Sequence, residues 1–153
     1  MNDSEREITR LVMTYAELQD RGDLEGVAAL FRYGSFVVDK VATPFRGSEE
    51  ISAMKRAHDR MYPDGTLRTK HVTTNLIVDV DDQAGTATAR SYYCVFQATD
   101  DLPLQPIIAG RYSDSFRRVD GRWWFHERFV HTDLIGDLSR HVVDNPMRGT
   151  ETR

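Results

Sequence analysis

The chain has 153 residues, of which 29% are charged and 40% are apolar, and its formal net charge is −4. One domain of this length can bury a core without staples, and its basic residues form no cluster that would bind the phosphates of a nucleic acid. The single cysteine, Cys94, excludes an intrachain disulfide, and no apolar run is long enough to span a bilayer, so we expect a cytoplasmic protein with neither nucleic acid nor membrane as a partner.

The first part of the chain is predicted to be helical. Ser4 and Glu7 form a candidate capping box, and the apolar residues that follow recur at helical spacing. This first helix is expected to end at Arg21-Gly22. Asp23 can cap a short second helix, and Ser48 can cap a third.

The second part of the chain is predicted to be strand, because β-branched and apolar residues alternate there. Asp120-Gly121 is a strong hairpin turn, and Pro103 and Pro106 are expected in a loop. The expected strands are residues 35–39, 69–80, 86–99, 107–119 and 122–133.

This order of elements predicts an α+β fold. We expect a cone-shaped α+β barrel, in which three N-terminal helices pack on a strongly curved, mostly antiparallel sheet. A curved sheet closed by helices leaves a concave interior, where small molecules usually bind. The expected domain covers residues 1–136, followed by a flexible C-terminal tail at residues 137–153.

Three residues are the best candidates for chemistry. His71 opens a predicted strand, and a neutral imidazole can take a proton from carbon or oxygen. Asp20 ends the first helix, where a carboxylate is mildly unfavourable with the helix dipole, and it can instead orient a histidine. Tyr15 lies on the apolar face of that helix, where its hydroxyl reaches either a core partner or a substrate.

Three local patterns carry a family resemblance. Residues 15–31 place Tyr15 five positions before Asp20, residues 71–75 open a strand with His71, and residues 112–125 contain the hairpin turn. Together they make the chain resemble the nuclear transport factor 2-like superfamily, and within it the SnoaL-like group. That group contains scytalone dehydratase, bile acid 7α-dehydratase and hexachlorocyclohexane dehydrochlorinase.

The resemblance implies roles for the candidate residues. Asp20 and His71 would form a catalytic dyad, and Tyr15 would hydrogen-bond the substrate. It also implies a homo-oligomer, most often a dimer or trimer, because members of the superfamily commonly pair the outer faces of their sheets.

A further set of residues is expected to contact a small-molecule ligand. If Trp123 and Phe129 face the interior, strand alternation predicts that His131 does too. There it would supply a second polar group, although a structural histidine is the alternative. Phe36 on the first strand and Asn75, on the strand that His71 opens, complete this set.

No metal or cofactor is expected. The chain lacks the spacings of common zinc sites, a Gly-rich phosphate loop and a Rossmann fingerprint. A metal site in which His71, His131 and Asp20 converge is the open alternative. His58 and His141 are expected on a helix surface and in the tail.

The favoured function is a cofactor-independent lyase or isomerase, similar to a dehydratase, that acts on a small, largely apolar carbonyl or hydroxyl compound. His71 would remove a proton, Asp20 would hold His71, and Tyr15 would donate a hydrogen bond to the substrate oxygen. Two alternatives come from other classes: a non-catalytic small-molecule binding module, and the small structural subunit of a ring-hydroxylating dioxygenase. Among enzymes, a polyketide cyclase or an epoxide hydrolase is the nearest alternative.

Overall fold

The computed structural model of the protein describes residues 1–143. Three helices and six strands make up this part of the chain. The helices are α1 (Asp3–Asp20), α2 (Leu24–Ala29) and α3 (Gly47–His58), and the strands are β1 (Ser35–Val38), β2 (Phe45–Arg46), β3 (Thr69–Asp81), β4 (Thr86–Thr99), β5 (Leu102–Val119) and β6 (Arg122–Ile135). The residues around Pro103 and Pro106, expected in a loop, belong to β5.

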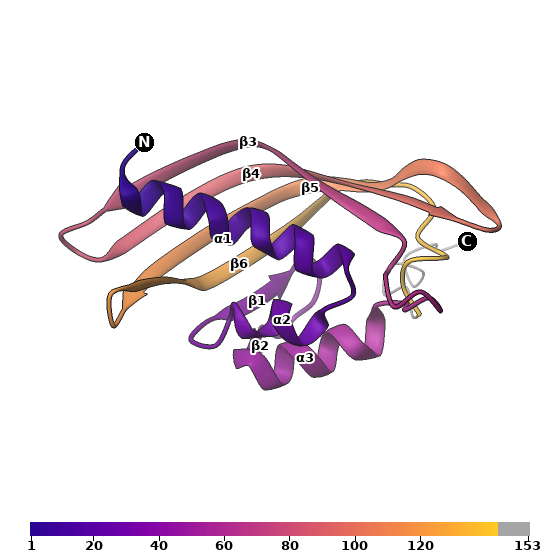
Figure 1. The fold of residues 1–153 in the computed structure, drawn as a ribbon, viewed down its shortest axis with the longest axis horizontal. Helices are drawn as coiled ribbons and strands as arrows, with labels where there is room; N and C mark the ends of the chain where they lie inside the picture. Colours follow the sequence, from indigo (N-terminus) through magenta and orange to yellow (C-terminus); the bar gives the residue numbers. More distant parts are fainter. Residues whose placement is uncertain (144–153) are drawn as a thin grey trace.

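The six strands form one sheet in the order β2-β1-β6-β5-β4-β3. Every neighbouring pair is antiparallel except β1 and β6, which are parallel. Figure 1 shows the long strands curving over α1, with α2 and α3 beside the short strands. The predicted α+β class, with three helices on a curved and mostly antiparallel sheet, is confirmed. The sheet stays open and does not close into a barrel, because its two edge strands, β2 and β3, do not pair with each other.

Helix α1 begins two residues earlier than its predicted capping box. The side chain of Asn2 accepts a hydrogen bond from the backbone of Glu5 (2.8 Å), and Glu5 accepts one from the backbone of Asn2 (3.0 Å). This pair satisfies the free amide groups in place of Ser4 and Glu7. Glu7 instead accepts a hydrogen bond from the backbone of β6. Asp23 caps α2 as predicted.

The core lies between α1 and the concave face of the sheet. Apolar side chains of α1, spaced at one turn, pack against the inward residues of β4, β5 and β6. Arg128 and Asp114 are buried in the same layer as an ion pair, with both hydrogen bonds 2.8 Å long. The buried side chains of α1 are Ile8, Val12, Tyr15, Ala16 and Gln19.

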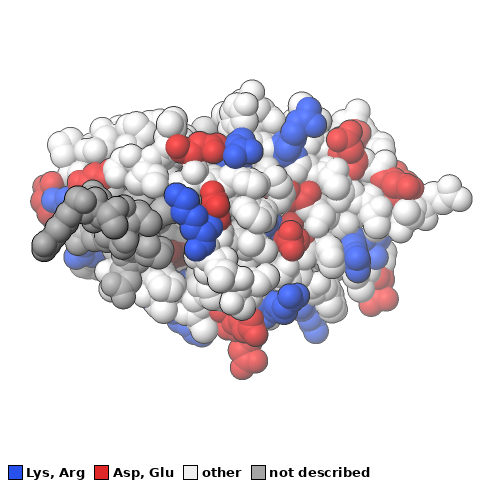
Figure 2. Space-filling view, turned by 180° about the vertical axis from the view of Figure 1, so that it is seen from behind, with Lys and Arg blue, Asp and Glu red and all other residues white. Residues whose placement is uncertain are grey.

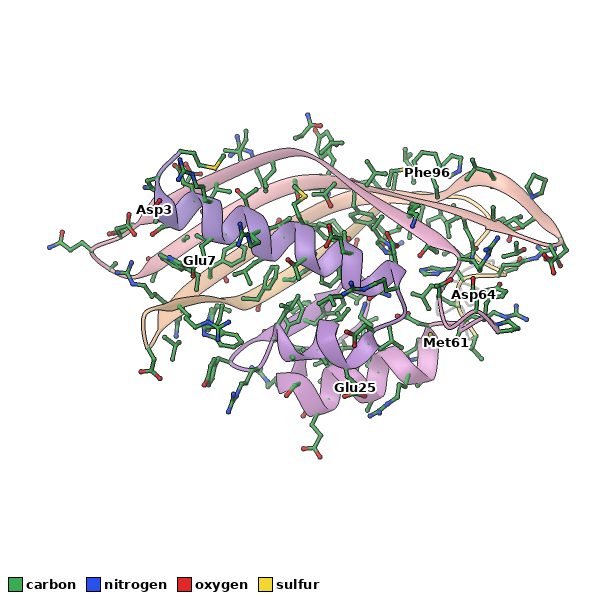
Figure 3. The ribbon with its side chains drawn as sticks, in the orientation of Figure 1. Asp3, Glu7, Glu25, Met61, Asp64 and Phe96 are labelled. Atoms are coloured by element: carbon green, nitrogen blue, oxygen red, sulfur yellow. The ribbon has the colours of Figure 1, made fainter. Side chains whose placement is uncertain are left out.

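None of the three helices in residues 1–143 covers the outer face of the sheet. Phe96 points to this side in Figure 3, and Val72, Ile77 and Tyr92 are exposed on it. Seen from behind, basic and acidic side chains are interspersed, with no large patch of one sign in that view (Figure 2). In residues 1–143, no helix combines the length and the apolar character needed to cross a membrane.

A bulge in β6 decides which residues face the core. Ser115 pairs with Glu127 and Phe116 pairs with Phe125, so β6 carries one extra residue, His126, at this point. Odd-numbered residues of β6 face inward before the bulge, and even-numbered residues face inward after it. The inward residues after the bulge are Arg128, Val130 and Thr132.

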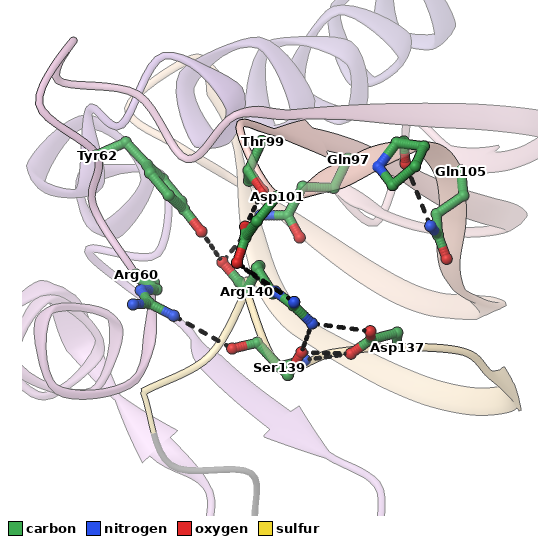
Figure 4. Close-up of polar contacts among 10 residues, drawn as sticks. Arg60, Tyr62, Gln97, Thr99, Asp101, Gln105, Asp137, Ser139 and Arg140 are labelled. Carbon is green, nitrogen blue, oxygen red and sulfur yellow. Dashed lines mark hydrogen bonds and ion pairs between the residues drawn. The ribbon is translucent and has the colours of Figure 1, made fainter.

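Residues 137–143 pack across the ends of α3 and β4 (Figure 4). The backbone carbonyl of Arg140 accepts hydrogen bonds from Tyr62 Oη (2.5 Å) and from Gln97 Nε2 (3.0 Å), and Val142 forms a β-bridge with Asp59. Leu138 is buried. We expected a loose tail from residue 137, but these backbone and apolar contacts order its first residues. The rest of that tail, residues 144–153, lies outside the described residues.

Candidate functional site

A cavity of about 340 Å³ opens between α1, α3, β1, the concave face of the sheet and residues 137–143. Most of its wall is apolar and aromatic, as is usual for a pocket that holds a small molecule. A few polar groups converge on it. They are Tyr15, Gln19, Lys55, His58, Asp59, His71, Tyr93, Thr132 and His141.

The end of α1 brings Asp20 to the start of β3. Helix α1 stops at Asp20, and Gly22 turns the chain with a φ of 74°, a conformation that glycine adopts without strain. The Asp20 carboxylate then accepts hydrogen bonds from three groups of β3. Thr69 Oγ1 lies 2.9 Å from Oδ1, the backbone N of His71 lies 2.9 Å from Oδ2, and His71 Nδ1 lies 2.6 Å from Oδ1. The hydrogen bond predicted between Asp20 and His71 is therefore present.

This network determines the ionisation of Asp20 and the tautomer of neutral His71. Burial by itself raises the pKa of Asp20, but the hydrogen bonds from His71 and Thr69 lower it below its ordinary value, so Asp20 stays a carboxylate. A carboxylate at Nδ1 requires that nitrogen to carry the proton in neutral His71. No hydrogen bond within the described part of the chain takes up Nε2, and the side chain lines the cavity. The free lone pair of Nε2 is thus available to a ligand.

Lys55, on the inner face of α3, is a functional candidate that the sequence did not predict. Its side chain is only 8% exposed, and Nζ donates a hydrogen bond of 3.3 Å to Tyr15 Oη. The nearest carboxylate oxygen, on Asp59, is 4.0 Å away. Burial lowers the pKa of Lys55, but Tyr15 and Asp59 together raise it above its ordinary value, so the side chain stays an ammonium.

Tyr15 and Tyr93 both line the cavity, but their hydroxyl groups differ. Tyr93 Oη donates to the backbone carbonyl of His131 at 3.0 Å, and burial raises the pKa of Tyr93 to about 12. Tyr15 Oη accepts from Lys55, and no described residue accepts the Tyr15 proton. The Tyr15 ring also lies against the guanidinium of Arg128, 4.3 Å from its centroid, which fixes the ring.

Several buried polar atoms at the cavity have no partner among the described residues. They are Gln19 Oε1, His58 Nδ1 and His141 Nδ1. Gln19 uses its amide nitrogen to donate to Asp59 at 2.7 Å, which leaves its oxygen free. Buried polar groups are normally hydrogen-bonded, so these atoms mark a place where a polar ligand or solvent fits.

His141 reaches the cavity from the C-terminal segment. Its ring centroid lies 6.3 Å from that of His71, and burial lowers the pKa of His141 to about 4, so it is neutral at physiological pH. His58, at the end of α3, lines the same cavity. We expected His58 on a helix surface and His141 in the tail. The helical spacing of Ile51, Met54 and His58 could have indicated His58, whereas nothing in the sequence pattern indicates His141.

The structure does not bring all the predicted ligand-contacting residues to the cavity. Phe36 lines it, as do Tyr15 and His71. Trp123 is buried at the far end of the sheet, where its backbone N bonds Glu7.

Phe129 and His131 face away from the cavity. They follow the extra residue of the β6 bulge, which reverses the expected alternation. On the outer side their rings stack 4.3 Å apart, and His131 Nε2 lies 3.0 Å from Ser113 Oγ.

Asn75 is the extra residue of a bulge in β3 and is exposed on the outer face. Its φ is 54°, and Asn is one of the few residues that tolerate this conformation. Within residues 1–143, no three His, Cys, Asp or Glu side chains lie close enough to hold a metal ion.

Comparison with known proteins gives one family and many similar folds. The profile of the SnoaL-like domain matches residues 2–129. No curated protein matches the chain. Among solved structures, a variant of Rv3472, a protein of unknown function from Mycobacterium tuberculosis, is 28% identical over 86% of this chain and 73% of that chain, with a TM-score of 0.67.

Two similar structures come from Novosphingobium aromaticivorans. An NTF2-like protein with a cystatin-like fold is 23% identical over 89% of this chain and 85% of that chain, with a TM-score of 0.71. A protein described as a candidate scytalone dehydratase is 23% identical over 88% of this chain and 87% of that chain, with a TM-score of 0.69. At these identities the likeness establishes the fold.

Proposed function

The chain belongs to the SnoaL-like domain family, and from that premise we propose that it is a cofactor-independent proton-transfer enzyme, a lyase or isomerase acting on a small carbonyl or hydroxyl compound. One observation carries the proposal: the Asp20 carboxylate holds both the ring and the backbone of His71. The ring is thereby fixed in one tautomer and one orientation, as a general base requires.

The reaction begins with proton removal. His71 Nε2 takes a proton from the carbon next to a carbonyl group. The electron pair of that C–H bond forms the C=C bond of an enolate, and the carbonyl pair moves to oxygen. Asp20 stabilises the imidazolium that results, and Tyr15 donates a hydrogen bond to the charged oxygen.

Two outcomes follow from the same enolate. In an isomerase, the imidazolium returns the proton to a different carbon. In a dehydratase, the enolate expels a hydroxyl group from the β carbon, and this group takes the proton from His71 and leaves as water. Dehydration is the activity named for one of the similar structures, and the apolar wall of the cavity suits a largely apolar substrate.

The alternative is a binding module that holds a ligand in the same cavity without turnover. The unpartnered polar atoms at the cavity favour a ligand under either hypothesis, so they do not separate the two. Proton exchange does separate them, because only the enzyme labilises a C–H bond.

The test is deuterium exchange. The protein is incubated in D₂O with a panel of small enolisable ketones and β-hydroxy ketones, and deuterium incorporation and loss of water are followed by mass spectrometry. We expect incorporation above the buffer rate, lowered at least ~10²-fold by His71→Gln and less by Asp20→Asn. His126→Gln is the matched control, since His126 lies in the β6 bulge, and it should exchange like the wild type.

Two outcomes would count against the proposal. Exchange in His71→Gln at the wild-type rate would exclude His71 as the base. Exchange at no more than the buffer rate across the panel, with tight binding of one compound, would favour the binding module.

A further inference from the structure

Lys55 is a buried cation whose hydrogen-bonding capacity is mostly unused. An ammonium group has three N–H donors. Nζ makes one hydrogen bond, of 3.3 Å, to Tyr15 Oη, and Asp59 at 4.0 Å is too far to accept another. No other acceptor for Nζ is found in residues 1–143. Two donors of a nearly inaccessible charge are therefore left over at the wall of a cavity.

The aromatic rings around Lys55 do not replace these hydrogen bonds. Nζ lies 4.7 Å from the centroid of Phe36 and 5.4 Å from that of Tyr15, so the rings supply cation–π attraction. They accept no N–H in the manner of an oxygen atom. A buried charge is normally both paired and hydrogen-bonded, which makes an oxygen of a ligand the missing partner.

Tyr15 adds a second donor at the same place. Its oxygen accepts from Lys55, so its own proton points elsewhere, and no described residue accepts it. The two groups thus offer N–H and O–H donors from atoms 3.3 Å apart at the wall of one cavity. The positive charge of Lys55 also polarises the Tyr15 O–H bond, which strengthens it as a donor.

We propose that Lys55 Nζ and the Tyr15 hydroxyl together form an oxyanion-binding site, which takes the oxygen of an enolisable ketone substrate as that oxygen becomes an enolate. This inference rests on the proposed proton-transfer function and names its substrate class. Lys55 is then a catalytic residue, because it touches the atom on which negative charge develops. Beside the largely apolar wall of this cavity, such a donor is worth more than in solution.

The same site predicts strong selection among ligands. A phenolate has the shape and the charge of an enolate but cannot react further. The site should therefore bind the ionised form of a phenol more tightly than the neutral form, whether or not any substrate is turned over.

The probe is 4-nitrophenol, whose absorbance distinguishes the phenol from the phenolate. It is titrated with the full-length protein over a range of pH at which the free compound changes ionisation. We expect the bound compound to be the phenolate, with an acidity roughly 10- to 1,000-fold greater than in solution, the range that a cation within about 4 to 6 Å produces. Lys55→Met should abolish this increase, and Tyr15→Phe should reduce it in part.

Controls separate charge from folding. Lys70→Met removes an exposed lysine on β3 and should leave the phenolate signal unchanged. Lys55→Met leaves Asp59 without its cation, so the double variant Lys55→Met/Asp59→Asn keeps the charge balanced and should lose the signal as well. Circular dichroism of each variant reports whether it is folded.

The outcomes are distinct from those of the exchange experiment. The oxyanion site is refuted if the wild type binds 4-nitrophenol as the neutral phenol, if folded Lys55→Met or the double variant still binds the phenolate as tightly as the wild type, or if millimolar 4-nitrophenol does not bind. His71→Gln should keep the phenolate signal. If it does and no ketone exchanges deuterium, the proposed enzyme activity fails while the oxyanion site stands.

Discussion

Two buried cations, Arg128 and Lys55, both contact Tyr15, and their surroundings differ. Arg128 is fully buried and makes two hydrogen bonds of 2.8 Å to Asp114, with its guanidinium 3.7 Å from the centroid of Tyr112. Lys55 makes one long hydrogen bond and has its carboxylate at 4.0 Å. Burial alone lowers the pKa of Arg128, but Asp114 raises it, so both side chains stay charged.

The difference separates a structural charge from a functional one. The planar guanidinium of Arg128 faces the planar carboxylate of Asp114 and forms two parallel hydrogen bonds with it, which makes the pair strong. Arg128 Nη1 is also without a hydrogen-bond partner among the described residues, but only Lys55 lines the cavity, so the unused donors of Lys55 contribute little to folding and are useful only when a ligand arrives. The following experiments measure how far this distinction holds.

Breaking the Arg128 pair should have the largest effect on stability. Asp114→Asn leaves a fully buried guanidinium without its counter-charge, and the expected loss is about 3 to 5 kcal/mol in the free energy of unfolding. Urea denaturation measures this loss. The double variant Asp114→Leu/Arg128→Met should recover most of it. A loss below about 1 kcal/mol in Asp114→Asn would mean that the pair is no structural anchor.

His141 sharpens the comparison from the cavity side, because it is buried, neutral and without a partner at Nδ1. Its pKa is about 4 when folded and about 6.5 when unfolded, so between these values the unfolded chain binds a proton that the folded chain does not. Stability is therefore lost as pH falls from about 6.5 to 4, by on the order of 2 kcal/mol from this residue.

The measurement is the free energy of unfolding at pH 7 and at pH 4.5. His141→Gln should flatten the decline relative to the wild type. The pKa of Asp20 is lowered, so its contribution to stability is lost only below about pH 4 and does not affect the comparison between pH 7 and pH 4.5. Parallel declines in wild type and variant would show that His141 does not couple folding to protons.

Removing the charge of Lys55 should change stability much less than breaking the Arg128 pair. In Lys55→Met the cost of burying an ammonium disappears, while Asp59 keeps its hydrogen bond from Gln19. We expect a change within about 1 kcal/mol of the wild type, measured by urea denaturation. A loss as large as that of Asp114→Asn would place Lys55 with the structural charges and remove the contrast.

The smallest effect is expected on the outer face. His131 contacts Phe129 and Ser113 there, away from the cavity. His131→Ala should change stability by no more than about 0.5 kcal/mol and leave both deuterium exchange and phenolate binding at wild-type levels. Loss of deuterium exchange in this variant would instead support the sequence-based prediction that His131 contacts the ligand.

Much of the fold follows from the sequence because its signals are local. The break at Gly22, the cap at Asp23 and the hairpin at Asp120-Gly121 each depend on the chemistry of one or two residues. The hydrogen bond between His71 and Asp20 was predictable from family resemblance, which carries information about distant contacts.

The cavity was harder to predict because two of its polar groups come from segments whose sequence does not show which residues face inward. Lys55 lies four residues after Ile51 on the same face of α3, and this spacing could have indicated that it faces the core. Lysine is rarely buried, however, so the residue type favours an exposed position. His141 lies in a segment with no periodicity, held by backbone hydrogen bonds that no side-chain pattern encodes.

The bulge at His126 has a consequence for the wall of the cavity. Beyond this residue β6 carries two sets of side chains: Arg128, Val130 and Thr132 on one face, and Glu127, Phe129 and His131 on the other. Strand alternation lets only one set reach the interior, and the extra residue selects it. Deleting His126 while keeping the rest of the register would exchange the two sets in a single step. The interior surface of this half of β6 thus depends on the number of residues in the strand as much as on their identity. A one-residue deletion there would replace every β6 side chain that faces the cavity.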